Sequence, residues 1–211
     1  MPERDTPSPA RLVLATHNAG KLRELRALLR DAVPGLDVDT QVIDAGAAGV
    51  PDVVESGTTF EENALLKARA VAEATGLPAV ADDSGLAVDV LGGAPGIFSA
   101  RWAGRHGDDS ANLQLLLSQL ADIPIQKRAA QFVCAAALAL PGGTDVVKRG
   151  ELQGVLLEKP RGEGGFGYDP VLQPDGMERS CAELAPEEKN AISHRAKAFS
   201  ALLPSIVEIL N

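Results

Sequence analysis

One long hairpin limits the folds open to this chain more than any other feature of its sequence. Residues from Arg128 to Leu140 are almost all apolar, the turn sequence PGGTD follows at residues 141–145, and residues 146–157 return as a second strand-like run. Two such runs joined by a glycine-containing turn predict antiparallel strands. Earlier segments instead alternate strand-like and helix-like patterns, which is typical of parallel strands. The two patterns together predict an α/β domain with a mixed sheet.

The first strand-like segment leads into a polar turn. Arg11 to Ala15 are predicted to form a buried strand, residues 16–21 (THNAGK) form the turn, and leucines at helical spacing follow. This order directs free backbone N–H groups at the turn, where an anion binds favourably. The P-loop motif is absent, because it needs an earlier glycine and a Ser or Thr after the lysine. The alternative is a plain connection in which Thr16 or Asn18 is only a helix cap.

Three consecutive segments follow with different patterns. Residues 36–42 alternate apolar and polar side chains as in a half-exposed strand. Residues 44–57 are rich in glycine, alanine and acidic residues and are predicted to form a loop. Thr59 and Glu62 fit a capping box at the start of a helix, which we expect to direct its apolar face toward the core.

The strongest candidate site lies between Leu77 and Arg101. A short apolar run at residues 78–81 predicts a buried strand, and Asp82 and Asp83 follow it. Ligands bind at the carboxyl ends of strands in α/β sheets, and adjacent residues on a strand face opposite sides. A solvated turn is the alternative interpretation. The glycine-rich sequence at residues 92–96 favours a metal or phosphate site instead.

Two segments in the last quarter of the chain also indicate function. Residues 160–170 (PRGEGGFGYDP) place four glycines around two aromatic residues, which suits closure over a flat ring, although a surface turn is the alternative. Ser193 is expected to cap the last helix. His194 and Arg195 then fall in its first turn, where the helix dipole disfavours basic residues. Such local conflicts are most common at functional sites.

Composition excludes several classes of partner. The 211 residues are 45% hydrophobic and 23% charged, and the formal net charge of −9 argues against non-specific binding to nucleic acid or to an anionic membrane. The spacing of Cys134 and Cys181 fits neither a zinc site nor a disulfide framework, so we expect a reducing cytoplasm. Residues 1–10 are predicted to be a disordered lead-in, and residues 11–211 to form one catalytic domain.

Four separated motifs in the chain resemble those of one known family. They are THNAGK at residues 16–21, TFEENALLKA at 59–68, ADDSGLAVDVLGGAPGIFSAR at 81–101, and GGFGYDP at 164–170 together with KNAISHRAKA at 189–198. In this order they resemble the inosine triphosphate pyrophosphatase family over essentially the whole chain after residue 10. Two positions depart from the family pattern: His17 is variable there, and Val54 precedes Glu55 where some relatives carry two acids.

The resemblance implies a fold and a reaction. The fold is an elongated, two-lobed α/β domain with a long mixed sheet flanked by helices, a cleft between the lobes, and usually a homodimer. The implied reaction is Mg²⁺-dependent hydrolysis of ITP, dITP or XTP to the monophosphate and pyrophosphate, which removes unusual purine nucleotides from the pool. We expect the segment from Gly92 to Arg101, with Phe98 and Trp102 near its end, to form the dimer contact.

The resemblance also implies the roles of individual residues. Glu55 and Asp83 would hold Mg²⁺, Asp83 would also be the general base, and Lys67 would neutralise developing charge. Whether Asp82 is a direct metal ligand stays open. The residues implied on the phosphates are Thr16, His17, Asn18, Ala19, Gly20, Lys21 and Ser84. The residues implied around the purine are Phe166, Gly167, Tyr168, Asp169, Lys189, His194 and Arg195.

Three other functions are alternatives to this activity. One is a pyrophosphatase acting on other modified nucleotides, such as pyrimidines, and another is a nucleotide-binding sensor without turnover. Because a sensor need not keep Glu55, Asp83 and Lys67, their presence favours an enzyme. A glycosidase is disfavoured, because adjacent Asp residues on one strand cannot place two carboxyl groups across a bond at the required separation of about 5 Å or more.

Overall fold

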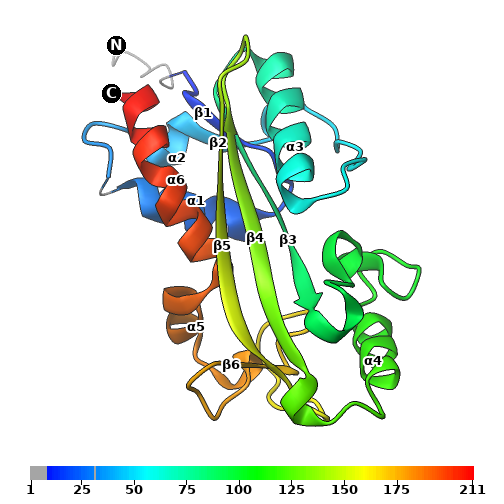
Figure 1. Ribbon diagram of the computed structural model, residues 1–211. Coiled ribbons are helices and arrows are strands. Elements are labelled where there is room, and N and C mark those ends of the chain that lie inside the picture. Colours follow the sequence, from blue (N-terminus) through cyan, green and yellow to red (C-terminus); the bar gives the residue numbers. More distant parts are fainter. Residues whose placement is uncertain (1–8, 31) are drawn as a thin grey trace, which may run out of the picture.

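Six strands form one mixed sheet in the order β2-β1-β3-β4-β5-β6 (Figure 1). The computed structural model describes residues 9–30 and 32–211, so residues 1–8 of the predicted lead-in lie outside the described residues. β1 pairs parallel with β2 and β3, and the other neighbours pair antiparallel, which confirms the predicted mixed sheet. The strands are β1 (Leu12–Leu14), β2 (Val42–Asp44), β3 (Ala79–Val88), β4 (Ala129–Ala139), β5 (Asp145–Leu156) and β6 (Leu172–Pro174).

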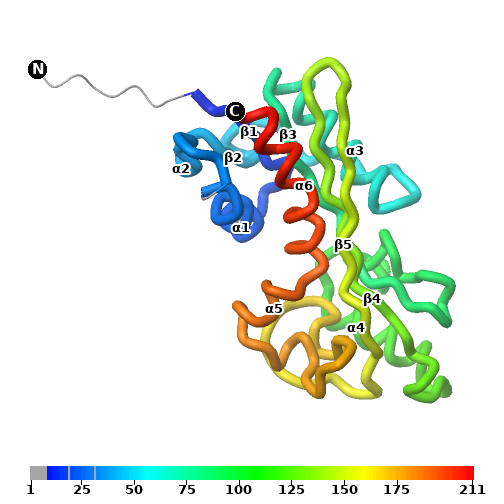
Figure 2. Tube along the Cα trace, turned by 60° about the vertical axis from the view of Figure 1, so that its left-hand side comes forward, coloured from blue at the N-terminus to red at the C-terminus, as the bar shows by residue number. Residues whose placement is uncertain are grey.

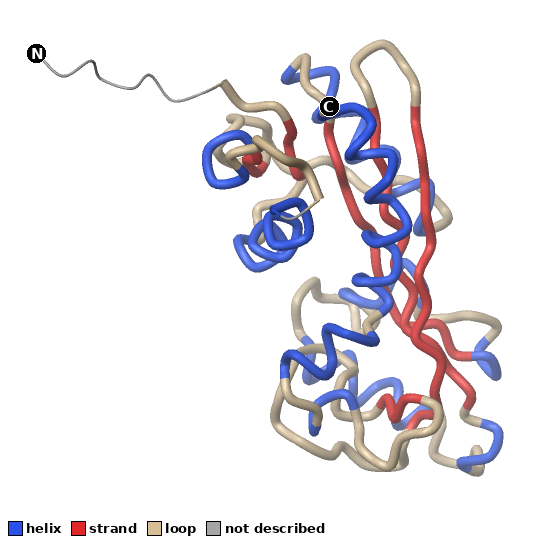
Figure 3. The backbone as a smooth tube through the Cα atoms, turned by 90° about the vertical axis from the view of Figure 1, so that its left-hand side faces the viewer, coloured by secondary structure: helices blue, strands red, loops and turns tan. Residues whose placement is uncertain are grey.

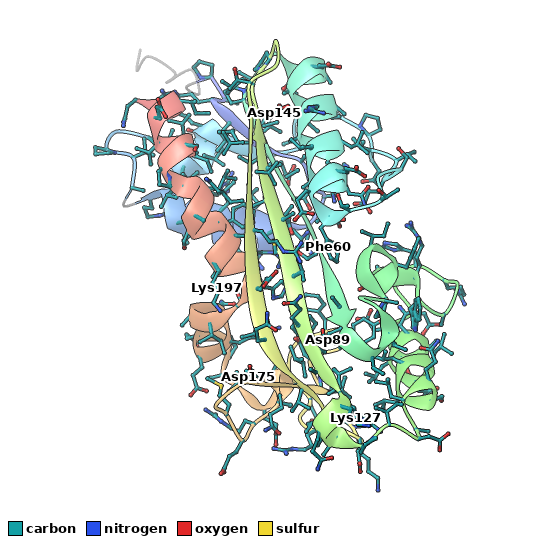
Figure 4. All side chains as sticks on the ribbon, viewed as in Figure 1. Phe60, Asp89, Lys127, Asp145, Asp175 and Lys197 are labelled. Carbon is teal, nitrogen blue, oxygen red and sulfur yellow. The ribbon has the colours of Figure 1, made fainter. Side chains whose placement is uncertain are left out.

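The predicted hairpin is the long axis of the molecule. β4 and β5 pair antiparallel along their whole length, and β3 pairs with β4 from Ala79 to Val88. Lys127 and Asp145, which lie close to opposite ends of the hairpin, are well separated along the molecule (Figure 4). Other elements gather around each end of these three strands, which gives the elongated shape with two lobes (Figure 1).

Helices cover both faces of the sheet in the lobe that contains β1 and β2. α3 packs on one face, and α6 runs along the other beside β4 and β5 (Figures 2 and 3). α1 packs with α6 on this second face. The helices are α1 (Ala19–Arg30), α2 (Val38–Gln41), α3 (Phe60–Thr75), α4 (Asp109–Gln119), α5 (Pro186–Ile192) and α6 (His194–Leu210).

Alternation along β3 decides where its polar residues point. Val80 belongs to the apolar cluster under α1 and α6, whereas Ala79 and Ala81 belong to the cluster under α3. Continuing this alternation by two residues places Asp82 on the α1–α6 face and Asp83 on the α3 face. The predicted opposite orientation of the two carboxylates is therefore confirmed by their separate partners, described below.

The second lobe has its own apolar core. Leu86 and Val88 at the end of β3 pack with Leu116 from α4, with Leu120 directly after this helix, and with the ring of Tyr168. The connecting segments of this lobe include four short 3₁₀ helices: η1 (Asp89–Leu91), η2 (Gly96–Arg101), η3 (Ile125–Lys127) and η4 (Cys181–Glu183). Because β3, β4 and β5 run through both lobes, the two cores lie on one continuous sheet.

Two local predictions were wrong. Residues 36–42 do not form a strand, because the Asp37 side chain accepts hydrogen bonds from the backbone N–H of Asp39 (3.1 Å) and from the Thr40 hydroxyl (2.7 Å), which starts the short helix α2. The strand predicted at residues 78–81 is also longer, since β3 continues to Val88 against β4. The two aspartates therefore lie within a strand rather than at its end.

The predicted caps of two helices are confirmed. Thr59 caps α3 by accepting a hydrogen bond from the Glu62 N–H (3.1 Å), and Ser193 caps α6 in the same way through the Ala196 N–H (3.0 Å). Cys134 is buried in the core. Within the described part of the chain, every helix is too short or too polar to cross a membrane.

Candidate functional site

A cavity of 470 Å³ opens between the two lobes and brings together most of the predicted site residues. A neighbouring cavity of 660 Å³ shares Lys21, Glu55, Lys67 and Asp82 with it. Predicted residues that line the first cavity are Asn18, Gly20, Lys21, Glu55, Lys67, Asp83, Ser84, Phe166, Gly167, Tyr168, Asp169, Lys189, His194 and Arg195. Thr16 and His17 line the second cavity, and Ala19 is the first residue of α1.

The turn between β1 and α1 is organised by its own side chains. The Asn18 carboxamide oxygen accepts hydrogen bonds from the backbone N–H groups of Gly20 (2.8 Å) and Lys21 (3.3 Å), and the Thr16 hydroxyl accepts one from the Asn18 N–H (3.2 Å). Asn18 is therefore a helix cap, as expected if the turn is a plain connection between strand and helix. An anion at this turn would depend on the Lys21 side chain, because Asn18 already satisfies these two helix donors.

Asp82 is held between two cations on the α1–α6 face. The Lys21 ammonium donates to both carboxylate oxygens at 2.9 Å, and the Arg195 Nε donates to one of them at 3.3 Å. Asp82 is only 3% exposed. Burial raises the pKa of Asp82, but the opposing charges of Lys21 and Arg195 outweigh burial and leave this pKa well below its usual value.

Asp83 belongs to a different group on the α3 face. It accepts hydrogen bonds from the Asn63 carboxamide (3.1 Å) and from the Ser84 backbone N–H (3.0 Å), and the Lys67 ammonium lies 3.8 Å from it. Lys67 also contacts the Glu55 carboxylate directly. Burial raises the pKa of Asp83 and the nearby Glu55 charge adds to this, while Lys67 opposes both. The net result is a raised pKa for Asp83.

The donor set on this face suits a hard divalent cation. Two carboxylates, Glu55 and Asp83, share the single positive charge of Lys67. Among the residues that the structure describes, no cluster of three or more His, Cys, Asp or Glu side chains could enclose a metal by itself. Mg²⁺ is usually bound by one or two carboxylates together with water and substrate phosphate, so the pair fits that ion.

The glycine-rich segment forms the opposite wall. The Phe166 ring is 67% exposed, and the Lys189 ammonium lies 5.0 Å from its centre. Asp169 pairs with Lys189 and accepts a hydrogen bond from the Phe166 N–H (2.8 Å), while Asp109 accepts one from the Gly167 N–H (2.9 Å). These contacts hold the backbone of the segment and leave the Phe166 side chain exposed toward the cavity.

His194 is a neutral group on the same wall. Burial lowers the pKa of His194 to about 3, and the positive charges of Arg195 and Lys189 act in the same direction. Its ring stacks on Phe132, with ring centres 5.0 Å apart. Within the described residues its Nδ1 is buried and has no hydrogen-bond partner.

Several residues of the cleft were not predicted. Asn63 lies four residues before Lys67 on α3, so helical spacing within the TFEENALLKA motif could have identified it. Phe132 reaches the cleft only through the register of β4 against β3, which the sequence does not specify. His106 and Asp109 come from the second lobe, and nothing in their local sequence marked them.

Comparison with known proteins gives the family. A model of the Ham1 family matches residues 12–205, which is nearly the whole chain. The chain belongs to the Ham1 family. Among curated Ham1 relatives, the dITP/XTP pyrophosphatase of Streptomyces coelicolor is 68% identical over 201 residues, covering 95% of this chain and 99% of that protein. That of Leifsonia xyli is 56% identical, covering 92% of this chain and 94% of that protein.

Solved Ham1 structures agree with the fold. The HAM1 protein from Coxiella burnetii superposes with a TM-score of 0.86 at 42% identity, covering 94% of this chain and 99% of the other. The nucleoside-triphosphatase / dITP/XTP pyrophosphatase from Mycobacterium abscessus gives 0.78 at 49% identity, covering 92% and 99%. These matches confirm the predicted family resemblance and fold, and the predicted enzyme class is the one that the relatives carry in their names.

Proposed function

We propose that this chain hydrolyses ITP, dITP and XTP to the monophosphate and pyrophosphate in a Mg²⁺-dependent reaction. The observation that carries the proposal is that one cavity contains both the Glu55–Lys67–Asp83 group and the Phe166–Lys189–His194 group. The first group suits phosphoryl chemistry and the second suits an aromatic base. The names of the relatives at 56–68% identity support the same activity for this chain.

The phosphates would lie along the β1–α1 turn and the α3 face of β3. Lys21 would exchange part of its contact with Asp82 for the phosphates, and the Ser84 hydroxyl would turn from Asp82 to donate to them. Glu55 and Asp83 would hold Mg²⁺, which polarises phosphate oxygens as a Lewis acid when bound. Lys67 would neutralise the charge that develops on the phosphates during the reaction.

Asp83 would accept the proton of the attacking water. Its raised pKa brings it closer to the range in which a carboxylate acts as a base near neutral pH. The Asn63 carboxamide and the Ser84 N–H both donate to this carboxylate and would fix its orientation toward the water. A protein that only bound nucleotides would need neither the base nor Lys67, so the arrangement favours turnover over sensing.

Base selection would come from the opposite wall. Phe166 would stack on the purine, and Lys189, Arg195 and the neutral His194 imidazole would face its edge. Inosine and xanthosine carry an acceptor at the 6-position where adenosine carries an amino donor. An adenine amino group would face an unmatched donor, and a buried mismatch of that kind costs roughly 1–3 kcal/mol.

We also propose a cytoplasmic homodimer. Val90 and Phe98 are 45% and 48% exposed on neighbouring 3₁₀ segments, and the Arg101 guanidinium lies 5.4 Å from the Phe98 ring centre. Exposed aromatic and arginine side chains of this kind are enriched in interfaces. Light scattering at micromolar concentration should give the mass of two chains, and Phe98→Glu should halve it. A monomeric mass for the unaltered protein would refute the dimer.

A substrate panel tests the proposed activity. Pyrophosphate release with Mg²⁺ should be fast for ITP, dITP and XTP, and much slower for ATP, GTP, CTP and UTP. Comparable kcat/KM for ITP and ATP would refute the base selection. Faster turnover of a pyrimidine triphosphate would favour the alternative class of substrate, and absence of turnover for every nucleotide would favour a sensor.

A further inference from the structure

Asp82 has no step of its own in the proposed reaction, yet it is the carboxylate on which two functional cations meet. Lys21 comes from the start of α1 and Arg195 from the first turn of α6. Both bind the same buried carboxylate, through a two-oxygen contact at 2.9 Å and a single contact at 3.3 Å. The Ser84 hydroxyl donates to it as well, at 3.3 Å.

The two cations are assigned to opposite ends of the nucleotide. In the proposed function, on which this inference rests, Lys21 binds the phosphates and Arg195 faces the base. Their common partner is Asp82, and Arg195 also lies 3.7 Å from the Glu24 carboxylate on α1. The Asp82 and Asp83 side chains project from opposite faces of β3, while Glu55 and Lys67 line the same cavity as Asp82.

Sharing one anion makes the two cations interdependent. A phosphate that binds Lys21 must compete with Asp82 for the ammonium group. Arg195 neutralises part of the Asp82 charge and thereby weakens the hold of Asp82 on Lys21. Without Arg195, the carboxylate would attract Lys21 more strongly, because the pair is buried and little screened by solvent. Arg195 should therefore assist phosphate binding even for a ligand that has no base.

We propose that Asp82 is a positioning residue that couples the phosphate end of the cleft to the base end through its shared contacts with Lys21 and Arg195. A base that draws Arg195 toward it changes how tightly Asp82 retains Lys21, and phosphates that draw Lys21 away change how tightly Asp82 retains Arg195. The coupling is reciprocal, as any coupling between two binding sites must be. It links recognition of the correct purine to placement of the triphosphate.

The Lys189–Asp169 pair of the same cavity provides a matched control. Lys189 pairs with Asp169 and is also a single positive charge on the base side, but it does not contact Asp82. Removal of either Lys189 or Arg195 takes one positive charge from the same cavity. If the two substitutions weaken ligand binding by different amounts, the difference in affinity therefore reflects the contact with Asp82 rather than the loss of charge alone.

Inorganic tripolyphosphate is the probe, because it carries the phosphates and no base. Its Kd is measured by titration calorimetry in the presence of a chelator, so that no hydrolysis takes place. Arg195→Ala should weaken binding about fivefold more than Lys189→Ala does, within the range found for coupled neighbouring residues. In the Asp82→Asn background this excess should disappear, because no carboxylate remains to retain Lys21.

Two results would overturn the coupling. One is an equal loss for Arg195→Ala and Lys189→Ala in the unaltered background, and the other is an excess that persists in the Asp82→Asn background. Thermal unfolding verifies that each variant is folded. If Asp82→Asn alone does not fold, the first comparison still decides. Because the probe has no base and is not hydrolysed, these results are independent of the substrate panel, which tests the proposed function separately.

Discussion

Asp83→Asn should separate catalysis from stability. The substitution preserves size, but it removes the anion that would hold Mg²⁺ and accept the proton of water. Losing a general base alone lowers kcat by about 10²- to 10⁴-fold, which corresponds to about 2.7–5.4 kcal/mol of activation free energy. Removal of a proposed metal ligand adds to that, so we expect kcat for ITP at saturating Mg²⁺ to fall at least a hundredfold.

The same substitution should change stability little, because loss of the buried charge offsets the one hydrogen bond that an Asn side chain, with a single acceptor oxygen, cannot accept. The pKa of Asp83 is raised in the folded protein, by burial first and also by Glu55. A carboxyl whose folded pKa is raised favours folding when protonated and opposes it once ionised, so at pH 7 its charge is a cost. Lys67 keeps Glu55 as a partner after the substitution. The free energy of unfolding at pH 7 should therefore stay within about 1 kcal/mol of that of the unaltered protein.

Urea unfolding and pyrophosphate release at pH 7 measure the two effects. Asp175→Asn is the matched control, because Asp175 is exposed and outside both cavities (Figure 4). It should leave kcat within about twofold, as expected for a surface change. A near-normal kcat for Asp83→Asn would show that Asp83 is neither the base nor a required ligand. Loss of activity together with loss of stability would mean that its role is structural.

Further variants test the base side of the cleft. Phe166→Ala should raise KM for ITP by an amount equivalent to roughly 1–3 kcal/mol, the range for base–aromatic stacking, whereas Arg195→Ala should reduce the ITP/ATP ratio of kcat/KM. An unchanged KM for the first and an equal loss on both nucleotides for the second would show that the base pocket is misassigned. His194 has a lowered pKa of about 3, so between pH 6.5 and 3 its unfolded form binds more protons and its contribution to stability falls on acidification. Between pH 6.5 and 3, urea unfolding should show that the His194→Gln variant loses less stability than the unaltered protein does. Equal losses in the two proteins would contradict a neutral buried imidazole.

The architecture was predictable where the signal is local. The apolar runs on either side of residues 141–145 specify the β4–β5 hairpin, and the cap residues Thr59 and Ser193 specify where two helices begin. Residues 36–42 were mispredicted because alternation alone cannot distinguish a short strand from one helical turn. There the side chain of Asp37, not the apolar pattern, decides the backbone conformation.

The site was predictable in its members but not in its partnerships. Spacing on a strand places Asp82 and Asp83 on opposite faces, but it does not reveal which cations each one meets. Those partners depend on how α1, α3 and α6 pack on the sheet, which brings Lys21 and Arg195 together from opposite ends of the chain. The contact of Phe132 with His194 likewise depends on strand register, which is a non-local property.

A competition experiment decides whether this chain selects unusual purines and releases pyrophosphate. Equal concentrations of ITP and ATP are mixed with the protein and Mg²⁺, and phosphorus NMR follows both nucleotides and the released phosphate species. We expect inosine monophosphate and pyrophosphate to form in equal amounts while ATP persists. Release of orthophosphate, or consumption of the two nucleotides at equal rates, would contradict it.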